Sequence, residues 1–424
     1  MAKITGVFKR IKSSLFFGLG VDRLTTEFRK FALMHVVYLL ATSTTMVFVN
    51  TLLMRVSTDD NIALQYNIVH FSFVSIAMVA AAILMRKLTN KKIIFIGVGM
   101  SMITYLLVLV FMNTLDIFYP VVAATHGIAT GFYWIIYFDS LMKYSTDDTR
   151  DVAMNFIGVC GGFVSLIMPL ACGYTIGAFA GFTGYYVMFA ILFLVAGVAV
   201  YLVTRLDVEQ PDHKKSQFFR LIKNTYTKKV WFFVIHMDFF KGIREGAFSF
   251  FLNVLLFSIV KSEGLVGINT FLVGGTSMIA CVIASKISRP SNRIRYMAIA
   301  TILLTIITTI LFIELNTVTV LMLSIANAML SVFMVNPVTT TLYTVFDKVP
   351  YAKELKNETF AVTEWYKNAG RISGIVFIMI MPDGGFWSVL SLAILVLTQI
   401  VTAIFAKITM DCLKKDYGEE QLDA

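Results

Sequence analysis

Charged side chains are scarce in this sequence. Aspartate, glutamate, lysine and arginine make up only 15% of its 424 residues, whereas 58% of the residues are hydrophobic. A soluble protein of this length could not bury so many apolar side chains, which excludes the soluble globular classes. We therefore expect a polytopic membrane protein.

Cysteines are few and catalytic motifs are missing. Of the four cysteines, Cys160, Cys172, Cys281 and Cys412, three lie in apolar runs and none has metal-ligand spacing, so no disulfide framework or zinc site is indicated. A P-loop, a nucleophile elbow and a nucleotide-binding domain are also missing from the sequence. We expect a protein that is not an enzyme, that needs no cofactor or metal, and that does not hydrolyse ATP.

The first 30 residues form a segment of their own. No small-residue cleavage site follows the first apolar run, so we expect no cleaved signal peptide. Within residues 1–20, apolar side chains recur on one helical face, whereas the basic ones lie mostly elsewhere. This pattern predicts an interfacial amphipathic helix on an anionic membrane surface, and a disordered basic tail is the alternative.

Twelve apolar runs are long enough to cross a membrane as helices. Their approximate limits are 31–55, 62–86, 92–112, 117–142, 151–178, 183–204, 230–259, 264–287, 295–313, 317–342, 358–381 and 385–408. The predicted fold is therefore all-α, with 12 transmembrane helices in two six-helix halves. We expect an N-terminal segment at 1–30, bundles at 31–204 and 230–410, a linker at 205–229 and a tail at 411–424.

The net charge of +10 is unevenly distributed. Basic residues cluster in alternate connections, which is topological information rather than a sign of nucleic-acid binding. The opposite connections carry only Arg55 and Lys261 as basic residues. We expect the protein to lie in the plasma membrane, and the positive-inside rule predicts that both termini are in the cytoplasm.

The two halves resemble each other. A shift of 208 residues places Phe138-Asp139 on Phe346-Asp347, Gly162 on Gly370 and Ser165 on Ser373. The same order and spacing in a six-plus-six layout indicates a duplicated unit. The linker at 205–229 contains a short amphipathic piece, residues 216–225, which predicts a surface helix.

Twelve spans, a central cytoplasmic linker and two similar halves resemble the major facilitator superfamily over essentially the whole chain. Around Lys241-Gly-Ile-Arg-Glu245 and Glu364-Trp-Tyr-Lys-Asn-Ala-Gly-Arg371, the sequence is similar to the YQGE-type transporters of Gram-positive bacteria. The family's loop between spans 2 and 3 carries an acidic residue where this chain has Arg86. That departure leaves open how the inner gating bond is made.

The resemblance implies that spans 1, 4, 7 and 10 line a central cavity and that spans 3, 6, 9 and 12 face lipid more. The latter four spans contain no ionisable acid, base or histidine in their apolar centres. Span 7 carries Asp238, Lys241 and Glu245 on one helical face, with Arg244 about 100° away. Such residues are costly in hydrocarbon and usually serve a site.

Span 11 repeats the arrangement with Glu364, Lys367 and Arg371 on one face. The four cations of the two spans outnumber their three carboxylates, and Asp139 is a candidate for the fourth carboxylate. A cation without a fixed carboxylate offers a place for an anionic substrate, and Arg244 and Arg371 are the leading candidates. Alternatively, the ion pairs simply lock the two spans together.

These patterns give each residue a predicted role. The predicted substrate contacts are Lys241, Arg244, Arg371, Lys367, Tyr133 and Trp134. The predicted proton-coupling carboxylates are Asp238, Glu245 and Glu364, because a carboxylate beside a cation can exchange its ion pair for a proton. The predicted cytoplasmic gate comprises Asp139, Asp347 and Arg150. Tyr133 and Trp134 could instead simply pack, and His70 and His126 fit hydrogen bonding to a neighbouring helix.

We therefore predict a monomeric secondary transporter that moves a small anionic or amphipathic solute by alternating access. Proton coupling is expected, and the aromatic character of spans 4 and 11 favours export. One alternative is a flippase for a lipid or lipid-linked precursor, because paired charges beside an apolar wall suit an amphiphile. The other is a membrane sensor or scaffold that transports nothing, although the short loops leave little room for a partner-binding domain.

Overall fold

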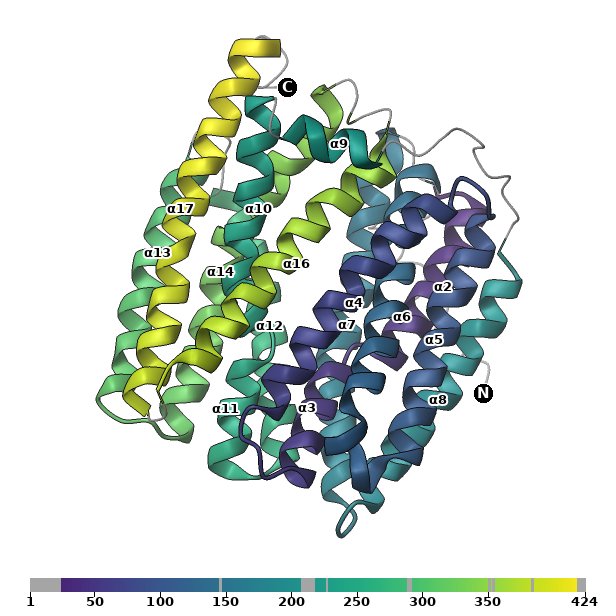
Figure 1. Ribbon diagram of the computed structural model, residues 1–424, viewed down its shortest axis with the longest axis vertical. Coiled ribbons are helices and arrows are strands. Elements are labelled where there is room, and N and C mark those ends of the chain that lie inside the picture. Colours follow the sequence, from purple (N-terminus) through teal and green to yellow (C-terminus); the bar gives the residue numbers. More distant parts are fainter. Residues whose placement is uncertain are drawn as a thin grey trace, which may run out of the picture.

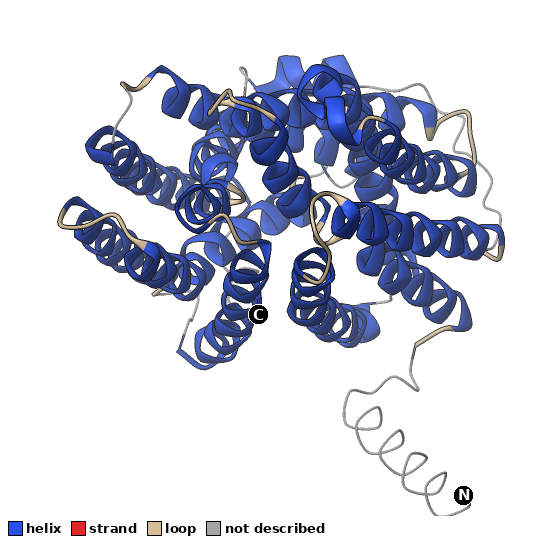
Figure 2. Ribbon diagram, turned by 90° about the horizontal axis from the view of Figure 1, so that it is seen from below, coloured by secondary structure: helices blue, strands red, loops and turns tan. Residues whose placement is uncertain are grey.

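The computed structural model describes residues 24–144, 147–206, 218–225, 228–287, 292–349, 352, 355–382 and 385–417. All secondary structure in these ranges is helical (Figure 2). The interfacial helix predicted over residues 1–20 lies outside the described residues.

The helices form two groups joined by a short linker helix (Figure 1). The N-terminal half contains α2 (Thr26–Thr42), α3 (Thr45–Val56), α4 (Ile62–Leu84), α5 (Asn90–Val110), α6 (Leu115–Tyr144), α7 (Asp147–Gly177) and α8 (Thr183–Thr204). The C-terminal half contains α10 (Lys229–Phe248), α11 (Phe251–Val260), α12 (Glu263–Ile287), α13 (Arg293–Thr309), α14 (Thr317–Lys348), α16 (Lys356–Ile380) and α17 (Gly385–Tyr417). The linker helix is α9 (Phe218–Thr225), within the stretch predicted to form one.

The two ends of the bundle are distinct in Figure 1, where α9 lies at the top and α3 and α11 lie at the bottom. We call these the linker end and the far end. Short 3-10 turns, η2 (Met112–Thr114) and η3 (Ile310–Phe312), lie where α6 begins and where α13 ends, at the far end.

The first span of each half is broken at an equivalent place. The first span consists of α2 and α3, which are separated by Ser43 and Thr44, and the seventh consists of α10 and α11, which are separated by Ser249 and Phe250. The breaks are 206 residues apart. Discontinuous helices at matching positions in two repeats are common next to transporter binding sites.

Eleven helical segments of the described residues are long and apolar enough to cross a membrane. The one predicted span outside this group is span 11, which is α16. This helix has 25 residues and is long enough, but its ionisable residues make it too polar for the group. It is tolerated because its polar side faces protein: Glu358, Glu364 and Asn368 are buried. The last helix also differs from the prediction, because α17 continues beyond residue 408 to Tyr417.

Two facing pairs of glycines bring α10 and α16 into close contact. Gly242 and Gly246 on α10 face Gly370 and Gly374 on α16. A Cβ atom on Gly370 would lie only 2.0 Å from the carbonyl oxygen of Phe239, and one on Gly246 would lie 2.3 Å from that of Arg371. Small residues four apart allow such backbone approach between membrane helices. The charged faces of the two helices are thereby held side by side.

The halves meet along two helix pairs, α4 with α16 and α7 with α12. Among the described membrane-spanning segments, the protein covers α7 and α12 the least. This corrects the expectation that spans 3, 6, 9 and 12 are the most lipid-facing: α17 packs against α10 and α13, and its Gln399 donates to the carbonyl oxygen of Phe240 at 3.0 Å.

Candidate functional site

A cavity of ≈ 410 Å³ lies between the two halves. Its lining residues come from α3, α4 and α6 on one side and from α10, α14 and α16 on the other. They are Met46, His70, Phe71, Thr130, Arg244, Glu245, Phe248, Ser249, Asn327, Ser331, Val335 and Arg371. The volume is in the range of small-molecule sites. Because the lining reaches Met46 and Ser249, both helix breaks adjoin the cavity.

Glu245 is shared by two cations. Arg371 Nη2 donates to Glu245 Oε2 at 3.0 Å, and Lys241 Nζ lies 3.6 Å from Glu245 Oε1. Arg371 Nη1 also donates to Asn368 Oδ1 at 2.7 Å, and Lys241 Nζ donates to Thr339 Oγ1 at 3.4 Å. One carboxylate therefore stands between two positive charges, at the contact between α10 and α16.

Arg244 is different, because no described carboxylate lies within ion-pair distance of it. Its Nη1 donates to the neutral Asn327 Oδ1 at 2.8 Å, and its guanidinium carbon lies 5.5 Å from the centre of the Phe248 ring. The side chain is buried, and Nε has no hydrogen-bond partner in the part of the chain that the structure describes. Of the two cations that the sequence left as candidates, Arg371 is paired with Glu245 and Arg244 is the one without a described carboxylate.

The remaining charges lie outside the cavity lining. Lys367 Nζ forms an ion pair with Glu364 Oε1, one turn earlier on α16. Asp238 on α10 is buried, and its Oδ1 has no hydrogen-bond partner among the described residues. Asp238, Glu245 and Glu364 thus offset three of the four cations, and the unmatched charge in the cavity is that of Arg244.

Tyr133 and Trp134 pack within the N-terminal half and do not line the cavity. The Tyr133 hydroxyl lies 2.5 Å from His35 Nδ1, and its ring stacks on Tyr38. The Trp134 ring lies edge-on to Tyr137, with 5.0 Å between ring centres. Their predicted contact with substrate stays a prediction, and the proposal below does not depend on it.

Two histidines form a pair beside the cavity. The rings of His70 on α4 and His126 on α6 have centres 4.2 Å apart. His126 Nδ1 lies 2.8 Å from the hydroxyl of Tyr66 on α4. The expected hydrogen bond to a neighbouring helix is thus present for His126. The close approach of α4 and α6 has a simple cause: a Cβ atom on Gly127 would lie 2.5 Å from the carbonyl oxygen of His70.

An ion pair joins the halves at the linker end. Arg86, just after α4, donates from Nε at 2.9 Å and from Nη2 at 2.5 Å to Glu358 Oε1 on α16. The Glu358 side chain is fully buried. Arg86 thus stands where the resemblance implies an acidic residue, and the carboxylate of this ion pair comes from the other half. We call this pair the linker-end latch.

Asp139 lies beside the linker-end latch. Its Oδ2 accepts a hydrogen bond from Asn90 at 2.6 Å, and its Oδ1 accepts one from Asn357 of the other half at 2.9 Å. It therefore bridges the halves at the linker end and is not the counter-charge of Arg244. The side chains of Asp347 and Arg150 lie outside the described part of the structure, so their predicted gate role stays a prediction.

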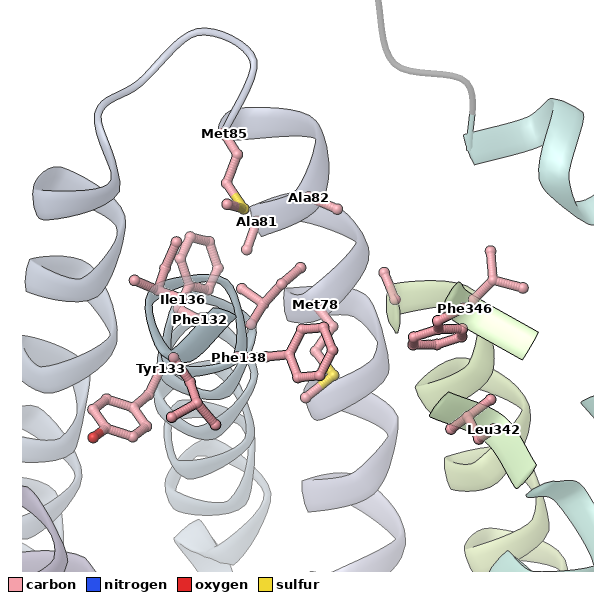
Figure 3. Close-up of a cluster of buried hydrophobic side chains, with 14 of the residues drawn as sticks. Met78, Ala81, Ala82, Met85, Phe132, Tyr133, Ile136, Phe138, Leu342 and Phe346 are labelled. Carbon is pink, nitrogen blue, oxygen red and sulfur yellow. The ribbon is translucent and has the colours of Figure 1, made fainter. Parts of the chain in front are cut away.

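Phe138 and Phe346 meet where the halves join. Figure 3 shows Phe138 of α6 pointing past Met78 toward Phe346 and Leu342 of α14. The two phenyl rings lie edge to face with centres 6.4 Å apart, and Phe138 also stacks on Phe360 at 4.3 Å. Residues matched by the 208-residue repeat thus face each other, as expected near a pseudo-two-fold axis.

A second ion pair joins the halves at the far end. Arg55 of α3 forms a bidentate pair with Glu263 of α12, with Nη2 to Oε2 at 2.7 Å and a second bond from Nε to Oε1. The hydroxyl of Tyr185 also donates to Glu263 Oε1, at 2.7 Å. We call this pair the far-end latch. The halves are thus bridged at both ends, and in each latch the N-terminal half supplies the arginine.

Several residues of the site were missed in the sequence. Phe71 and Asn327, which contact Arg371 and Arg244, carry no charge and resemble ordinary membrane-span residues. Glu263 and Glu358 were visible as charges at span ends, but their partners are distant in the sequence. The paired Gly-xxx-Gly spacing on the two most charged spans was a detectable signal for their close packing.

The fold and the site define a polytopic secondary transporter that takes a small-molecule substrate, rather than an enzyme. The chain belongs to the Major Facilitator Superfamily, whose family pattern matches residues 31–381. It is 25% identical over 321 residues to the "Uncharacterized protein YqgE" of Bacillus subtilis (strain 168), covering 74% of this chain and 73% of that protein.

Solved structures share the fold at low identity. A structure of the proton dependent oligopeptide transporters superposes with a TM-score of 0.69 and 12% identity, covering 92% of this chain and 99% of that one. The human organic anion transporter MFSD10 superposes with a TM-score of 0.60 and 12% identity, covering 92% of this chain and 100% of that one. The nucleoside transporter NupG superposes with a TM-score of 0.58 and 13% identity, covering 92% of this chain and 100% of that one.

Proposed function

We propose that this transporter moves a small organic anion and that Arg244 is its main substrate contact. The observation that carries the proposal is a buried cation in the wall of the cavity, without a carboxylate partner among the described residues. A bound anion supplies the missing counter-charge in a site of low dielectric, where charge pairing is strong. Phe71, Phe248 and Val335 offer the substrate an apolar wall.

We further propose that protons are coupled to the anion through Glu245. The ionised carboxylate pairs with Lys241 and with Arg371, and only Arg371 lines the cavity, so the carboxylate competes with an anion for Arg371. A proton on Glu245 removes that competition and raises the positive charge next to Arg244. Proton and anion then bind better together than separately, which is a positive linkage. Asp238 and Glu364 are less suited to proton coupling, because neither lines the cavity.

A positive linkage between proton and anion favours their movement in the same direction. An inward proton gradient would then drive uptake. No contact between described residues in the cavity supports export, which stays a prediction from aromatic content alone. An amphiphile carried by a flippase is likewise an alternative without a supporting contact of its own in the described cavity.

Alternating access in this chain requires the two latches to break in turn. The linker end is proposed to face the cytoplasm of the plasma membrane, because its connections are basic. Inward opening breaks Arg86 from Glu358, and outward opening breaks Arg55 from Glu263, while the halves rock about the cavity. The cavity lies between the two halves of the chain, and we propose a functional monomer.

The substrate class is tested by thermal unfolding of the purified protein with matched solute pairs at two pH values. The pairs are benzoate with benzamide, succinate with succinamide, and glycerol phosphate with glycerol. We expect at least one anion to raise the unfolding temperature more than its neutral counterpart does, and more at the lower pH. Equal shifts for every anion and its neutral counterpart would contradict the proposal.

A further inference from the structure

A second cavity lies at the far end and is separate from the central one. It has a volume of ≈ 500 Å³ and is bounded by the end of α7, the start of α12 and the residues between α11 and α12. Its charged lining residues are Arg55, Lys261 and Glu263. None of these lines the central cavity, so the transport site does not account for it.

The two cations of this cavity are unusual in the sequence. Among the described residues, Arg55 and Lys261 are the only basic ones at the far-end helix ends and connections, which otherwise carry five carboxylates: Asp59, Asp60, Asp116, Glu263 and Glu314. They come from equivalent places in the two halves, the ends of α3 and α11, at the same 206-residue offset as the helix breaks. The fold therefore brings both basic residues of an acidic face to one cavity.

A shared aromatic ring fixes how the two cations lie. The guanidinium carbon of Arg55 is 5.9 Å from the centre of the Phe257 ring, and Lys261 Nζ is 5.8 Å from the same centre. Both distances are within the range of cation–π attraction. Glu263 is already bonded by Arg55 and by Tyr185, so this cavity has one positive charge more than its carboxylate can neutralise.

Lys261 is also held in an unusual backbone conformation. It caps α11 with φ 50°, in the left-handed region that favours glycine, and no other described non-glycine residue has a positive φ. Its backbone N–H donates to the carbonyl oxygen of Phe257 at 2.8 Å. Glycine would adopt this conformation at lower cost, which points to a role for the lysine side chain. Lys261 forms no ion pair within the described residues.

The cavity lies where the transporter is least covered by its own helices. Tyr174 in its wall is 62% exposed, and α7 and α12 are the described spans with the most surface free for lipid. Two cations at the ends of two membrane helices, α3 and α11, lie beside aromatic side chains and suit a phosphate group at the membrane surface.

We propose that this cavity is a phosphate site, filled by the headgroup of an anionic phospholipid or by free phosphate. The phosphate contacts Lys261 and the exposed edge of Arg55, and it competes with Glu263 for that arginine. Occupancy therefore loosens the far-end latch. This inference does not depend on which solute the central cavity carries.

The test compares thermal unfolding of the full-length protein in a neutral detergent with added phosphatidylglycerol, phosphatidylcholine or inorganic phosphate. We expect phosphatidylglycerol, inorganic phosphate or both to stabilise the protein, and phosphatidylcholine to have a much weaker effect. The Lys261→Gln variant should lower the apparent affinity about fivefold, whereas Lys261→Arg should retain it. The Glu263→Gln variant should raise the affinity, because it releases Arg55.

The Lys414→Gln variant is the matched control, since Lys414 lies on α17 at the linker end. It should bind like the unaltered protein. Stabilisation by phosphatidylglycerol alone identifies a lipid as the ligand, and stabilisation by inorganic phosphate to the same extent identifies the free anion. The proposal is overturned if neither stabilises the protein, or if Lys261→Gln and Lys414→Gln behave alike.

Discussion

Arg244 on α10 donates a hydrogen bond to Asn327 on α14 at 2.8 Å, and this amide is its nearest described polar partner. The next residue on α10, Glu245, pairs with Arg371 and Lys241 instead. Adjacent residues on a helix point about 100° apart, which places one cation outside the ion-pair cluster. Arg244 is therefore a buried cation in the cavity wall without an ion-pair partner among the described carboxylates.

Replacing Arg244 by methionine should stabilise the protein in the absence of solute. A buried cation without a carboxylate is costly, and apolar replacements of buried charges are often neutral or stabilising by about 1–4 kcal/mol. Thermal unfolding of the purified Arg244→Met variant checks this. The matched Arg371→Met variant should be destabilised, because that arginine has Glu245 as a partner. A less stable Arg244→Met protein would show that Arg244 has a structural counter-charge.

Replacing Glu245 by glutamine should lower the stability of the protein and raise its affinity for the anion. The variant leaves Lys241 and Arg371 without their carboxylate. Because the side chains of Glu245 and Arg371 are about one-fifth exposed, the loss of stability should be smaller than the roughly 3–5 kcal/mol of a fully buried pair. In the unaltered protein, anion affinity should rise as the pH falls, because protonated Glu245 no longer competes. The Glu245→Gln variant should hold the higher affinity at both pH values. If anion affinity in Glu245→Gln depends on pH as strongly as in the unaltered protein, the coupled proton binds to another group.

The contact between α10 and α16 predicts a sharp difference between two glycines. In the Gly370→Ala variant the new methyl group overlaps the carbonyl oxygen of Phe239, so the helices must separate and we expect a loss of about 1–3 kcal/mol. A methyl group on Gly99 of α5 would meet no described neighbouring atom within 4 Å, so Gly99→Ala should gain up to about 1 kcal/mol from helix propensity. Thermal unfolding that ranks the two variants in the opposite order would argue against this packing.

The linker-end latch predicts a charge-swap rescue. Either Arg86→Glu or Glu358→Arg places like charges together at a buried site, and each should lower stability by about 3–5 kcal/mol. The double variant restores an opposite pair in reversed order and should regain much of the loss. Unfolding temperatures of the four proteins form a double-mutant cycle. If the two losses simply add, the residues do not interact across the halves.

Much of the fold was accessible from the sequence, because hydrophobic run length and repeat spacing depend on local pattern alone. Phe138 and Phe346, matched by a shift of 208 residues, face each other across the halves. The helix breaks next to the cavity were not predicted, since neither Ser43–Thr44 nor Ser249–Phe250 carries a proline or a glycine. Their conformations depend on tertiary packing.

The candidate site was predicted only in outline. The charged faces of spans 7 and 11 were recognised, but which cation lacks a carboxylate depends on side-chain direction and on a helix from elsewhere in the chain. Asp139 was a reasonable counter-charge by sequence, yet two asparagines hold it at the linker end. Tyr133 resembled a cavity residue, but His35 and Tyr38 enclose it in the N-terminal half.

The central claim is tested most directly by measuring equilibrium binding of the most stabilising anion from the solute panel. Calorimetry would compare the unaltered protein, Arg244→Gln and the control Lys414→Gln. We predict that Arg244→Gln lowers the affinity for the anion at least about tenfold, which is the scale of one lost charged hydrogen bond. The control should bind the anion with unchanged affinity. Unchanged anion affinity in Arg244→Gln would contradict the account.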